Sequence, residues 1–491
     1  MARLNSKLLA DLQIPRPNYD RKHIKPGIVH LGIGAFHRAH QAFYTESVMN
    51  NAGGDWGIIG CSLRSPAVQQ QLQPQDCLYT LLERGAHNRP QIIGAVQQVL
   101  VGPDDPAAII AAIAEPSVKI ISLTVTEKGY CHHPASGQLN RDHPDIQHDI
   151  RHPDQPKSAP GFIVAGLRPR WRNNATPVSV MSCDNLPDNG TVTRAVVTGL
   201  AEAVEPELAV WIRANVAFPG TMIDRIVPAT TAADIEWLEK EYGYRDEGLV
   251  VAEPFSQWVI EDNFCSGRPA WEKAGALLVK DVGHYETMKL RLLNGSHSLL
   301  AYSGYLAGYP TIYQVMQDED FVALTRAFMT SAARTFTAPS KFDVAAYQQQ
   351  LRERFANPGL QHKTWQIAMD GSQKIPQRWL NSLRKLVEQQ ANTQIYAFAL
   401  AAWIRFVKAV DEQNNAIVIS DPHASKFAEI WLQHGQNFPA LVTAFFALHE
   451  VFGQDLGRNT LPQEQVTYWL NIIAGDGIRD ALRQFLKQQE G

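Results

Sequence analysis

A lysine, an asparagine and a histidine lie close together in an otherwise apolar stretch late in the middle of the chain. Residues 288–300 carry Leu and Met on nearly every side at helical spacing, which predicts a helix that is buried all round. If each residue advances about 100° along that helix, Lys289, Asn294 and His297 project within a sector of roughly 140°, and Glu286 falls inside the same sector. That side of the helix must face polar groups.

These side chains are suited to moving a proton at an oxygen atom. Burial disfavours the ammonium form of Lys289, so we expect its pKa to fall toward the range used by general acids and bases near neutral pH. Asn294 can donate an amide hydrogen bond to a carbonyl or alkoxide oxygen, and His297 can position a hydroxyl group. The alternative is an interior lysine paired with Glu286, because structural ion pairs perturb lysines as well.

Length and composition limit the class of protein. At 491 residues the chain is too long for one ordinary core, and its 45% hydrophobic and 19% charged residues predict a folded, soluble protein. The formal net charge is −4 and no block of Lys and Arg stands out, so we expect no nucleic-acid partner.

The cysteines and the apolar runs indicate the compartment. The five cysteines lack paired spacing, and the histidine-rich stretch 132–152 matches no metal-binding pattern, so we predict neither disulfides nor a metal site. The N-terminus lacks the apolar core of a signal peptide, and no apolar run reaches membrane-spanning length. We therefore expect a cytoplasmic protein without a membrane partner.

A glycine-containing turn follows the first apolar strand. Residues 28–31 lead into the turn Gly32–Gly34, and a helical pattern comes next. A strand, a glycine turn and a helix N-terminus together can hold a pyrophosphate, because bare backbone lets the phosphates approach. His37 stands where a dinucleotide fingerprint has its third glycine, so a plain turn is the alternative. We expect His37 and the positive charge of Arg38 to face the phosphates.

The second strand, 56–62, should end with an acidic residue that holds the adenosine ribose of a dinucleotide. That acid is absent, and the run continues with Arg64. Arg64 either faces a 2′-phosphate or is simply exposed, so the sequence leaves the choice between NAD and NADP open.

Two further strands, 118–125 and 178–184, end in polar loops. Thr124 and Glu127 belong to the first loop, and Asn185 begins the second. Ligands bind outside the carboxyl ends of the strands in an open parallel sheet, so both loops should reach the cofactor or the substrate. The alternative reading of these residues is turn chemistry.

Polar groups later in the chain are candidates for substrate contacts. Asp224, or the pair at 261–262, can contact a polyhydroxylated ligand or belong to a solvated loop. The segment 361–374 gathers His362, Lys363 and Lys374 around a tryptophan, and such a group can bind a carboxylate or hydroxyls. An exposed junction between helices explains that segment equally well.

The pattern of the chain changes after Val282, where long helical periodicities replace strands. We predict an α/β protein with a Rossmann-type dinucleotide-binding domain at 1–283. A mainly α-helical substrate and catalytic domain should follow at 284–491.

Several motifs together resemble the mannitol dehydrogenase family of long-chain polyol dehydrogenases. The resemblance runs over almost the whole chain, with the motifs in the family's order. They are Gly32-Ile33-Gly34-Ala35-Phe36-His37-Arg38-Ala39-His40, Thr124-Val125-Thr126-Glu127-Lys128-Gly129-Tyr130, Ser182-Cys183-Asp184-Asn185, and Lys289 with Asn294 and His297.

The resemblance implies metal-independent hydride transfer between a nicotinamide cofactor, NAD with NADP not excluded, and a sugar-derived ketone or alcohol. Lys289 would be the acid/base, Asn185 and Asn294 would bind the reacting oxygen, and His297 would orient the substrate. Residues expected at the cofactor are Gly32, Gly34, Ala35, Phe36, His37, Arg38, Arg64, Thr124 and Glu127. Residues expected at the substrate are Asp224, His362, Lys363 and Lys374.

Within the family, the run 362–374 looks like the fructuronate reductase, or D-mannonate oxidoreductase, branch. Mannitol 2-dehydrogenases carry an arginine where Gln366 stands, whereas Leu63-Arg64-Ser65 looks more like the mannitol enzymes. We therefore expect a keto sugar acid as the substrate, with a polyol 2-dehydrogenase as the alternative. The substrate carboxylate would need a cation, for which His362, Lys363, Lys374 and Arg378 are candidates.

Two other classes use part of the same pattern. A methyltransferase would use the glycine turn without needing Lys289, and a binding protein could keep the fold without catalysis. The expected partner is a small sugar acid or polyol, and the expected assembly is a monomer or a small homo-oligomer.

Overall fold

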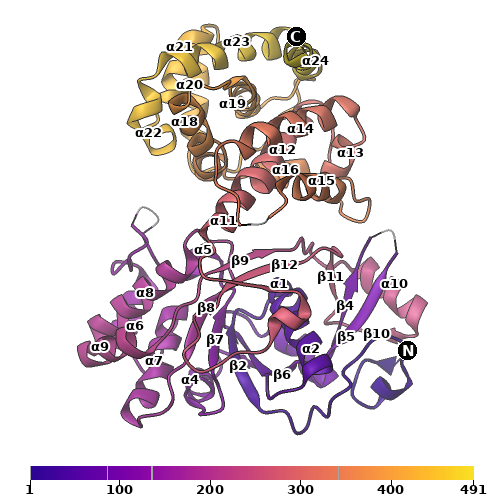
Figure 1. The fold of residues 1–491 in the computed structure, drawn as a ribbon, viewed down its shortest axis with the longest axis vertical. Coiled ribbons are helices and arrows are strands. Elements are labelled where there is room, and N and C mark those ends of the chain that lie inside the picture. The colour runs from indigo at the N-terminus through magenta and orange to yellow at the C-terminus, as the bar shows by residue number, and fades with distance from the viewer. Residues whose placement is uncertain (1, 86, 134–135, 341, 491) are drawn as a thin grey trace. The chain divides into compact units, whose positions relative to one another are not determined.

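The chain folds into two compact units, Met1–Gly283 and His284–Gly491, each of which has its own core (Figure 1). The structure is a computed structural model that describes residues 2–85, 87–133, 136–340 and 342–490.

A five-stranded parallel sheet forms the centre of the N-terminal unit (Figure 1). Its strand order, β6-β3-β2-β7-β8, places the first strand in the middle, which is the arrangement of a Rossmann-type fold. The strands are β2 (Pro26–Leu31), β3 (Gly57–Ser62), β6 (Val96–Val101), β7 (Ile120–Leu123) and β8 (Ser179–Ser182).

Helices cover both faces of this sheet because its residues alternate between two cores. Val29 and Leu31 pack with residues of α4, α7, α8 and α9, whereas Ile28 on the opposite face packs with α2. The helices of the unit are α1 (Ala35–Ala39), α2 (Gln41–Ala52), α3 (Ala67–Leu72), α4 (Pro106–Ala114), α5 (Thr126–Gly129), α6 (Pro144–Arg151), α7 (Ala159–Arg172), α8 (Asn189–Val204), α9 (Pro206–Asn215) and α10 (Ala232–Tyr242).

Three smaller sheets complete the N-terminal unit, with orders β11-β4-β5, β13-β12-β9 and β1-β10. Their strands are β1 (Ala2–Arg3), β4 (Tyr79–Glu83), β5 (Arg89–Ile93), β9 (Thr221–Asp224), β10 (Tyr244–Arg245), β11 (Val250–Ala252), β12 (Gln257–Glu261) and β13 (Leu277–Val279).

The C-terminal unit is built from helices. They are α11 (Gly283–Lys289), α12 (Gly295–Leu306), α13 (Ile312–Val315), α14 (Glu319–Ala333), α15 (Val344–Phe355), α16 (Thr364–Ala368), α17 (Gly371–Ile375), α18 (Asn381–Glu388), α19 (Gln394–Phe406), α20 (Ala424–His434), α21 (Phe438–Phe446), α22 (His449–Gly457), α23 (Thr460–Asp476) and α24 (Ile478–Glu490). Two π-helical segments, Leu290–Asn294 and Pro376–Leu380, interrupt this pattern.

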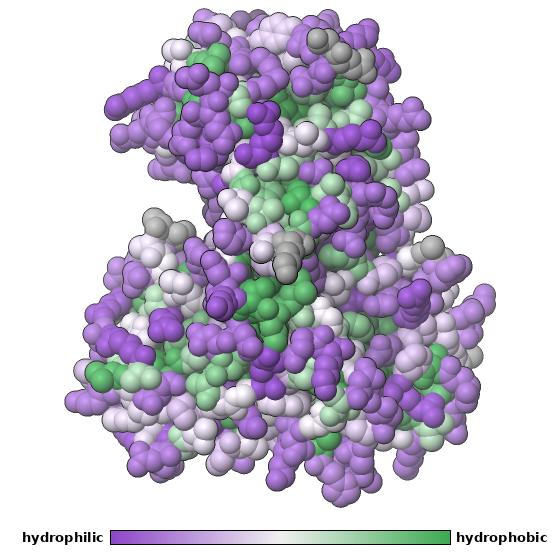
Figure 2. Space-filling model, in the orientation of Figure 1, coloured by the Kyte–Doolittle hydropathy of each residue, from purple (hydrophilic) through white to green (hydrophobic). Residues whose placement is uncertain are grey.

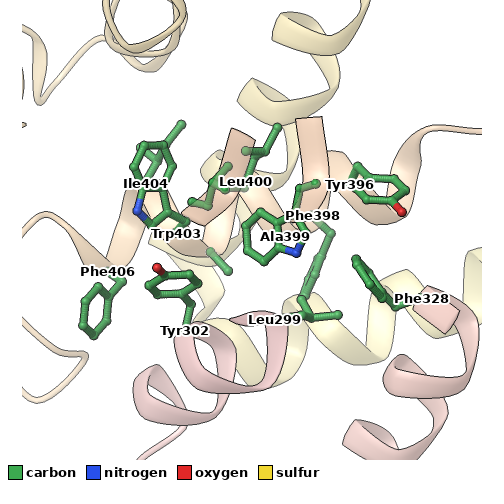
Figure 3. Close-up of a cluster of buried hydrophobic side chains, with 14 of the residues drawn as sticks. Leu299, Tyr302, Phe328, Tyr396, Phe398, Ala399, Leu400, Trp403, Ile404 and Phe406 are labelled. Atoms are coloured by element: carbon green, nitrogen blue, oxygen red, sulfur yellow. The ribbon is translucent and has the colours of Figure 1, made fainter. Parts of the chain in front are cut away.

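Two buried helices, α12 and α19, form the centre of that unit (Figure 3). Tyr302 of α12 packs edge-on against Phe406 of α19, with ring centroids 5.3 Å apart, and Phe328 of α14 packs against Tyr396 at 5.2 Å. The apolar faces of several helices therefore hold α12 in a fixed orientation.

Hydrophilic side chains cover most of the face shown in Figure 2. Within the described part of the chain, no helix combines the length and apolar character that crossing a bilayer requires.

Glu46 is a buried carboxyl group in the N-terminal unit. It accepts hydrogen bonds from the Tyr19 hydroxyl at 2.7 Å, the Gly94 amide at 2.9 Å and the Asn50 side chain at 3.1 Å. Burial is the main reason that its pKa rises from 4.5 to about 7, although these hydrogen bonds offset part of the shift. Folding therefore favours the protonated form, and the stabilisation is lost as pH rises from 4.5 through about 7.

We predict that Glu46→Gln flattens the pH dependence of stability in this window. A shift of this size corresponds to about 3 kcal/mol in the free energy of unfolding. Urea denaturation across the window measures it, and Glu236→Gln on the exposed surface of α10 is the matched control. Equal pH slopes for Glu46→Gln and the unaltered protein would contradict the assignment.

Candidate active site

A left-handed glycine begins the turn after β2. Gly32 has φ of +95°, and a Cβ atom there would lie 2.1 Å from the Thr124 carbonyl oxygen, so only glycine fits. The Thr124 hydroxyl donates a hydrogen bond to the Gly32 carbonyl at 2.7 Å and lies 2.8 Å from Nε2 of His30. The loop after β7 therefore fixes the shape of the turn after β2.

A buried polar chain supports the turn from below. Nδ1 of His30 lies 2.7 Å from the Ser122 hydroxyl, which donates to the Gln41 side chain at 2.7 Å. The ring of His37 stacks on His30 with centroids 3.4 Å apart. Burial lowers the pKa of His30 to about 3 and the pKa of His37 well below its usual value, so both rings are neutral.

The structure corrects the expected positions of His37 and Arg38. Both side chains are buried, because α1 is only five residues long and turns its inner face toward the core before the backbone breaks at His40. The Arg38 guanidinium donates to the Gly248 carbonyl at 2.6 Å and lies 5.4 Å from the centre of the Tyr79 ring. The guanidinium also donates to the Gly34 carbonyl at 3.4 Å, so it bonds backbone carbonyls of the unit.

A cavity of about 270 Å³ lies beside the glycine turn. Four expected cofactor residues line it, namely Gly32, Gly34, Arg64 and Thr124, whereas Ala35, Phe36, His37, Arg38 and Glu127 do not. A Cβ atom on Gly34 would meet nothing closer than 3.9 Å, so the backbone there is open to a ligand. The cavity and its bare backbone fit the phosphate-bearing part of a dinucleotide.

Sequence reasoning missed other residues that line this cavity. Asp145 is the second residue of α6, and Lys157 precedes the N-cap of α7, both far along the chain from the glycine turn. The Ser158-Ala159-Pro160 start of a helix was the available signal, since serine followed by proline marks a helix N-terminus.

Asp184 connects the two polar loops at the carboxyl ends of β7 and β8. Its carboxylate accepts hydrogen bonds from the Val125 amide at 2.9 Å, the Thr126 amide at 3.1 Å and the Tyr130 hydroxyl at 2.7 Å. Asn185 follows directly and is exposed. The position of Asn185 is thus set by a partly buried acid, Asp184, to which the sequence analysis gave no role of its own.

The two remaining candidates of the N-terminal unit differ in exposure. Asp224 ends β9 and is buried, whereas Glu127 is exposed on the short helix α5.

Lys289 and Asn294 lie at the two ends of a π-helical turn in the C-terminal unit. The segment Leu290–Asn294 is π-helical, and the Gly295 amide donates to the carbonyl of Leu290, five residues back. The sector of roughly 140° expected for Lys289, Asn294 and His297 assumed a regular α-helix, and the π-helical turn corrects that assumption. Residues five apart are about one turn apart in a π-helix. Lys289 and Asn294 therefore share one side of the helix.

Side chains of the second π-helical segment, Pro376–Leu380, donate hydrogen bonds to backbone carbonyls of this turn. The Trp379 indole donates to the Gly295 carbonyl at 3.0 Å, and Arg378 reaches the Asn294 carbonyl at 3.5 Å and the Ser298 hydroxyl at 2.8 Å. A Cβ atom on Gly295 would lie 3.2 Å from the Arg378 carbonyl oxygen, so glycine permits this close approach. The widened turn is thus fixed by specific donors.

Several buried polar atoms near this turn lack partners. Among the described residues, the Asn294 amide oxygen, the Ser296 hydroxyl and Nδ1 of His362 find no hydrogen-bond partner. Buried polar groups are rarely left unsatisfied, so these atoms indicate a site for a polar ligand.

Basic groups gather around His297. Its ring stacks on Phe355 with centroids 5.2 Å apart and meets the ring of His362 edge-on at 4.9 Å. Burial and the nearby positive groups, with His362 and Arg378 first, hold the pKa of His297 well below its usual value. Burial and then Arg378 lower the pKa of Lys374 to about 8, while Lys363 is exposed.

Two conserved-domain profiles cover most of the chain. Residues 26–273 match the mannitol dehydrogenase Rossmann domain, and residues 281–474 match the mannitol dehydrogenase C-terminal domain.

The chain belongs to the mannitol dehydrogenase family.

The chain is similar to named relatives over nearly its full length. The chain is 47% identical to the uncharacterized oxidoreductase YeiQ of Escherichia coli (strain K12), covering 96% of this chain and 97% of that one. It is 45% identical to the D-mannonate oxidoreductase of the same organism, covering 92% and 93%. The structure of Pseudomonas fluorescens mannitol 2-dehydrogenase in a ternary complex with NAD and D-mannitol superposes with a TM-score of 0.87, at 37% identity and 99% coverage of both chains.

These similarities decide several expectations. The family resemblance is confirmed, as are the Rossmann-type N-terminal unit and the helical C-terminal unit. This member of the mannitol dehydrogenase family is an oxidoreductase. The alternative prediction of a methyltransferase is therefore wrong.

Thr124→Val tests how the glycine turn is held. The substitution removes the hydroxyl that bonds the Gly32 carbonyl, so we expect the affinity for NADH to fall about tenfold, the size of a lost buried hydrogen bond. Titration of NADH fluorescence measures the change. Thr124→Ser keeps the hydroxyl and should bind normally; valine binding as tightly as threonine would show that the hydroxyl does not set the turn.

Proposed function

We propose that this protein is an NAD-dependent oxidoreductase that interconverts a keto sugar acid and its hydroxy acid, of the D-fructuronate and D-mannonate type. The observation that carries the substrate assignment is the group of partly buried basic side chains around buried His297. Identity supports the same choice, at 45% to the D-mannonate oxidoreductase and 37% to the mannitol 2-dehydrogenase.

The basic group is poised for an anion. Arg378 and Lys374 each lower the pKa of His297, and Arg378 also lowers that of Lys374, so these groups repel one another when charged. Asp370 and Asp421 oppose the shift at Lys374 only in part, because its pKa still falls to about 8. A bound carboxylate would relieve the repulsion and accept charge-assisted hydrogen bonds. A neutral hydroxymethyl group would do neither.

In the proposed mechanism, Lys289 is the general acid and base. Bound NAD supplies the hydride acceptor, or as NADH the hydride. During reduction, protonated Lys289 gives its proton to the alkoxide oxygen that forms from the ketone; during oxidation, the neutral amine removes the hydroxyl proton. The Asn294 amide donates to the same oxygen, and neutral His297 orients a substrate hydroxyl.

Other roles stay predictions of the family pattern. Asn185 would offer a second carboxamide to the reacting oxygen, and Asp224, His362 and Lys363 would contact the substrate. Partly buried His362 suits this role better than exposed Lys363. All five cysteines are free thiols, which suits a reducing compartment such as the cytoplasm.

A polyol 2-dehydrogenase is the second candidate. The similarity to the mannitol 2-dehydrogenase spans 99% of the chain. The sequence Leu63-Arg64-Ser65 after β3 also looks more like the mannitol enzymes. Steady-state rates with fructuronate, tagaturonate, fructose and mannonate separate the two. The proposal expects a far higher kcat/KM for a keto acid than for fructose, and comparable values would contradict it.

Lys374→Met should separate charged from neutral substrates. We expect KM for the keto acid to rise about tenfold or more, because a charge-assisted bond is lost, while fructose is little affected. In the unaltered enzyme, KM for the keto acid should rise as pH increases through about 8, where the amine loses its proton. Lys385→Met on α18, an exposed lysine paired with Glu388, is the control. Equal effects on both substrates would remove Lys374 from the carboxylate site.

A further inference from the structure

Two cavities of the N-terminal unit adjoin one another at the carboxyl ends of β3 and β6. The first, of about 270 Å³, lies beside the glycine turn, and the second, of about 510 Å³, has a mixed lining whose apolar part includes Leu63, Pro103, Pro106 and Phe162. They share the side chains of Leu63, Arg64, Asp145 and Lys157. One continuous groove thus leads from bare backbone, past three charged groups, to an apolar surface that suits a planar base.

The usual acid of a dinucleotide site is missing from this groove. In Rossmann-type domains a carboxylate at the end of the second strand accepts hydrogen bonds from the adenosine ribose. Here β3 ends in Ser62 and continues with Arg64 and Ser65. Among the residues that the structure describes, Asp145 is the single carboxylate that lines either cavity.

Asp145 is held in place by the start of α6. Pro144 opens the helix, the Asp145 amide donates to Nδ1 of His143 at 3.2 Å, and the next residue, Ile146, is buried in the core. The Asp145 carboxylate is partly buried and lies 4.0 Å from the guanidinium of Arg64. Its direction into the groove is therefore set by the fold and not by a mobile loop.

Lys157 is anchored on the other side by a buried acid. Its amide donates to Asp149 at 2.8 Å, and Asp149 also accepts from the amide and the hydroxyl of Ser158 at 3.0 and 2.6 Å. The backbone of Lys157 is thus fixed at the N-terminus of α7. The groove consequently contains two cations, Arg64 and Lys157, that are balanced by one carboxylate.

We propose that Asp145 takes over the task of the missing acid after β3 and makes the enzyme select NAD over NADP. The inference rests on the proposed function, which makes NAD the cofactor. The Asp145 carboxylate can accept hydrogen bonds from ribose hydroxyls and repels a 2′-phosphate. Without it, Arg64 and Lys157 are left facing the same space, where they attract a phosphate.

A purely structural role for Asp145 predicts a different effect on nucleotide binding. An ion pair 4.0 Å long with an arginine whose side chain is 83% exposed contributes little to stability. If the pair were its only role, removing the carboxylate would leave the preference between the two nucleotides unchanged.

The test is the binding of NADH and NADPH to the full-length protein, followed by nucleotide fluorescence and by calorimetry with ADP-ribose and 2′-phospho-ADP-ribose. We expect Asp145→Asn to weaken NADH about tenfold and to strengthen NADPH about tenfold, so that the preference shifts about a hundredfold. Asp142→Asn, an exposed acid shortly before α6, is the control and should not change the preference.

Two double variants sharpen the result. Adding Arg64→Ala to Asp145→Asn should remove the gain in NADPH binding. Adding Ser65→Asp should restore the preference for NADH, since it returns a carboxylate to the end of β3. Ser65 is exposed and its hydroxyl accepts from the Ala67 amide, a bond that aspartate can also make.

Failure of this inference is distinguishable from failure of the proposed function. A preference within twofold of the unaltered protein in Asp145→Asn, with tight NADH binding retained, would overturn the role of Asp145 alone. An unaltered protein that binds neither nucleotide, or prefers NADPH, would overturn the inference together with the choice of NAD.

Discussion

The cost of removing charge from water governs the C-terminal unit. Lys289 is 7% exposed at the end of α11, beside the large apolar core of the unit. Burial of this kind disfavours an ammonium group relative to the neutral amine, which is the physical basis of the proposed role in proton transfer. The packing of α12 against α19 and α14 keeps water out of the core beside Lys289.

In the N-terminal unit, buried polar side chains hold the glycine turn in its conformation. The turn after β2 must present bare backbone in a left-handed conformation, and a buried chain from Gln41 through Ser122 and His30 to Thr124 holds it there. His30 of this chain and His37, which stacks on it, are neutral, so the support adds no charge behind the groove. The charged side chains that line the groove are Arg64, Asp145 and Lys157, and the proposal assigns the contacts with the nucleotide to them.

Sequence patterns predicted the fold class and the family correctly, since apolar runs specify buried parallel strands. The strand predicted at 56–62 is β3 (Gly57–Ser62), whereas the strands predicted at 118–125 and 178–184 are shorter, because Thr124 and Asp184 already serve the polar loops. The π-helical turn after Lys289 could not be predicted. It depends on donors from Trp379 and Arg378, which lie far away in sequence.

The same limit applies at the cofactor groove. Arg38 follows a glycine turn and has the chemistry of a phosphate ligand, but its hydrogen-bond partner is Gly248, 210 residues later. Asp145 and Lys157 belong to no motif that the sequence analysis identified, and the folded chain brings them to the same cavity as Arg64. Local patterns identify which residue types are available, while the direction of each side chain is decided by distant contacts.

The most direct test of the central claim is the rate of hydride transfer in Lys289→Ala, measured in a single turnover from the loss of NADH absorbance with a keto sugar acid. The account predicts unchanged NADH binding, a rate at least a hundredfold lower, and partial recovery on addition of methylammonium, which replaces the missing amine. A rate within tenfold of the unaltered enzyme, with no response to the added amine, would contradict it.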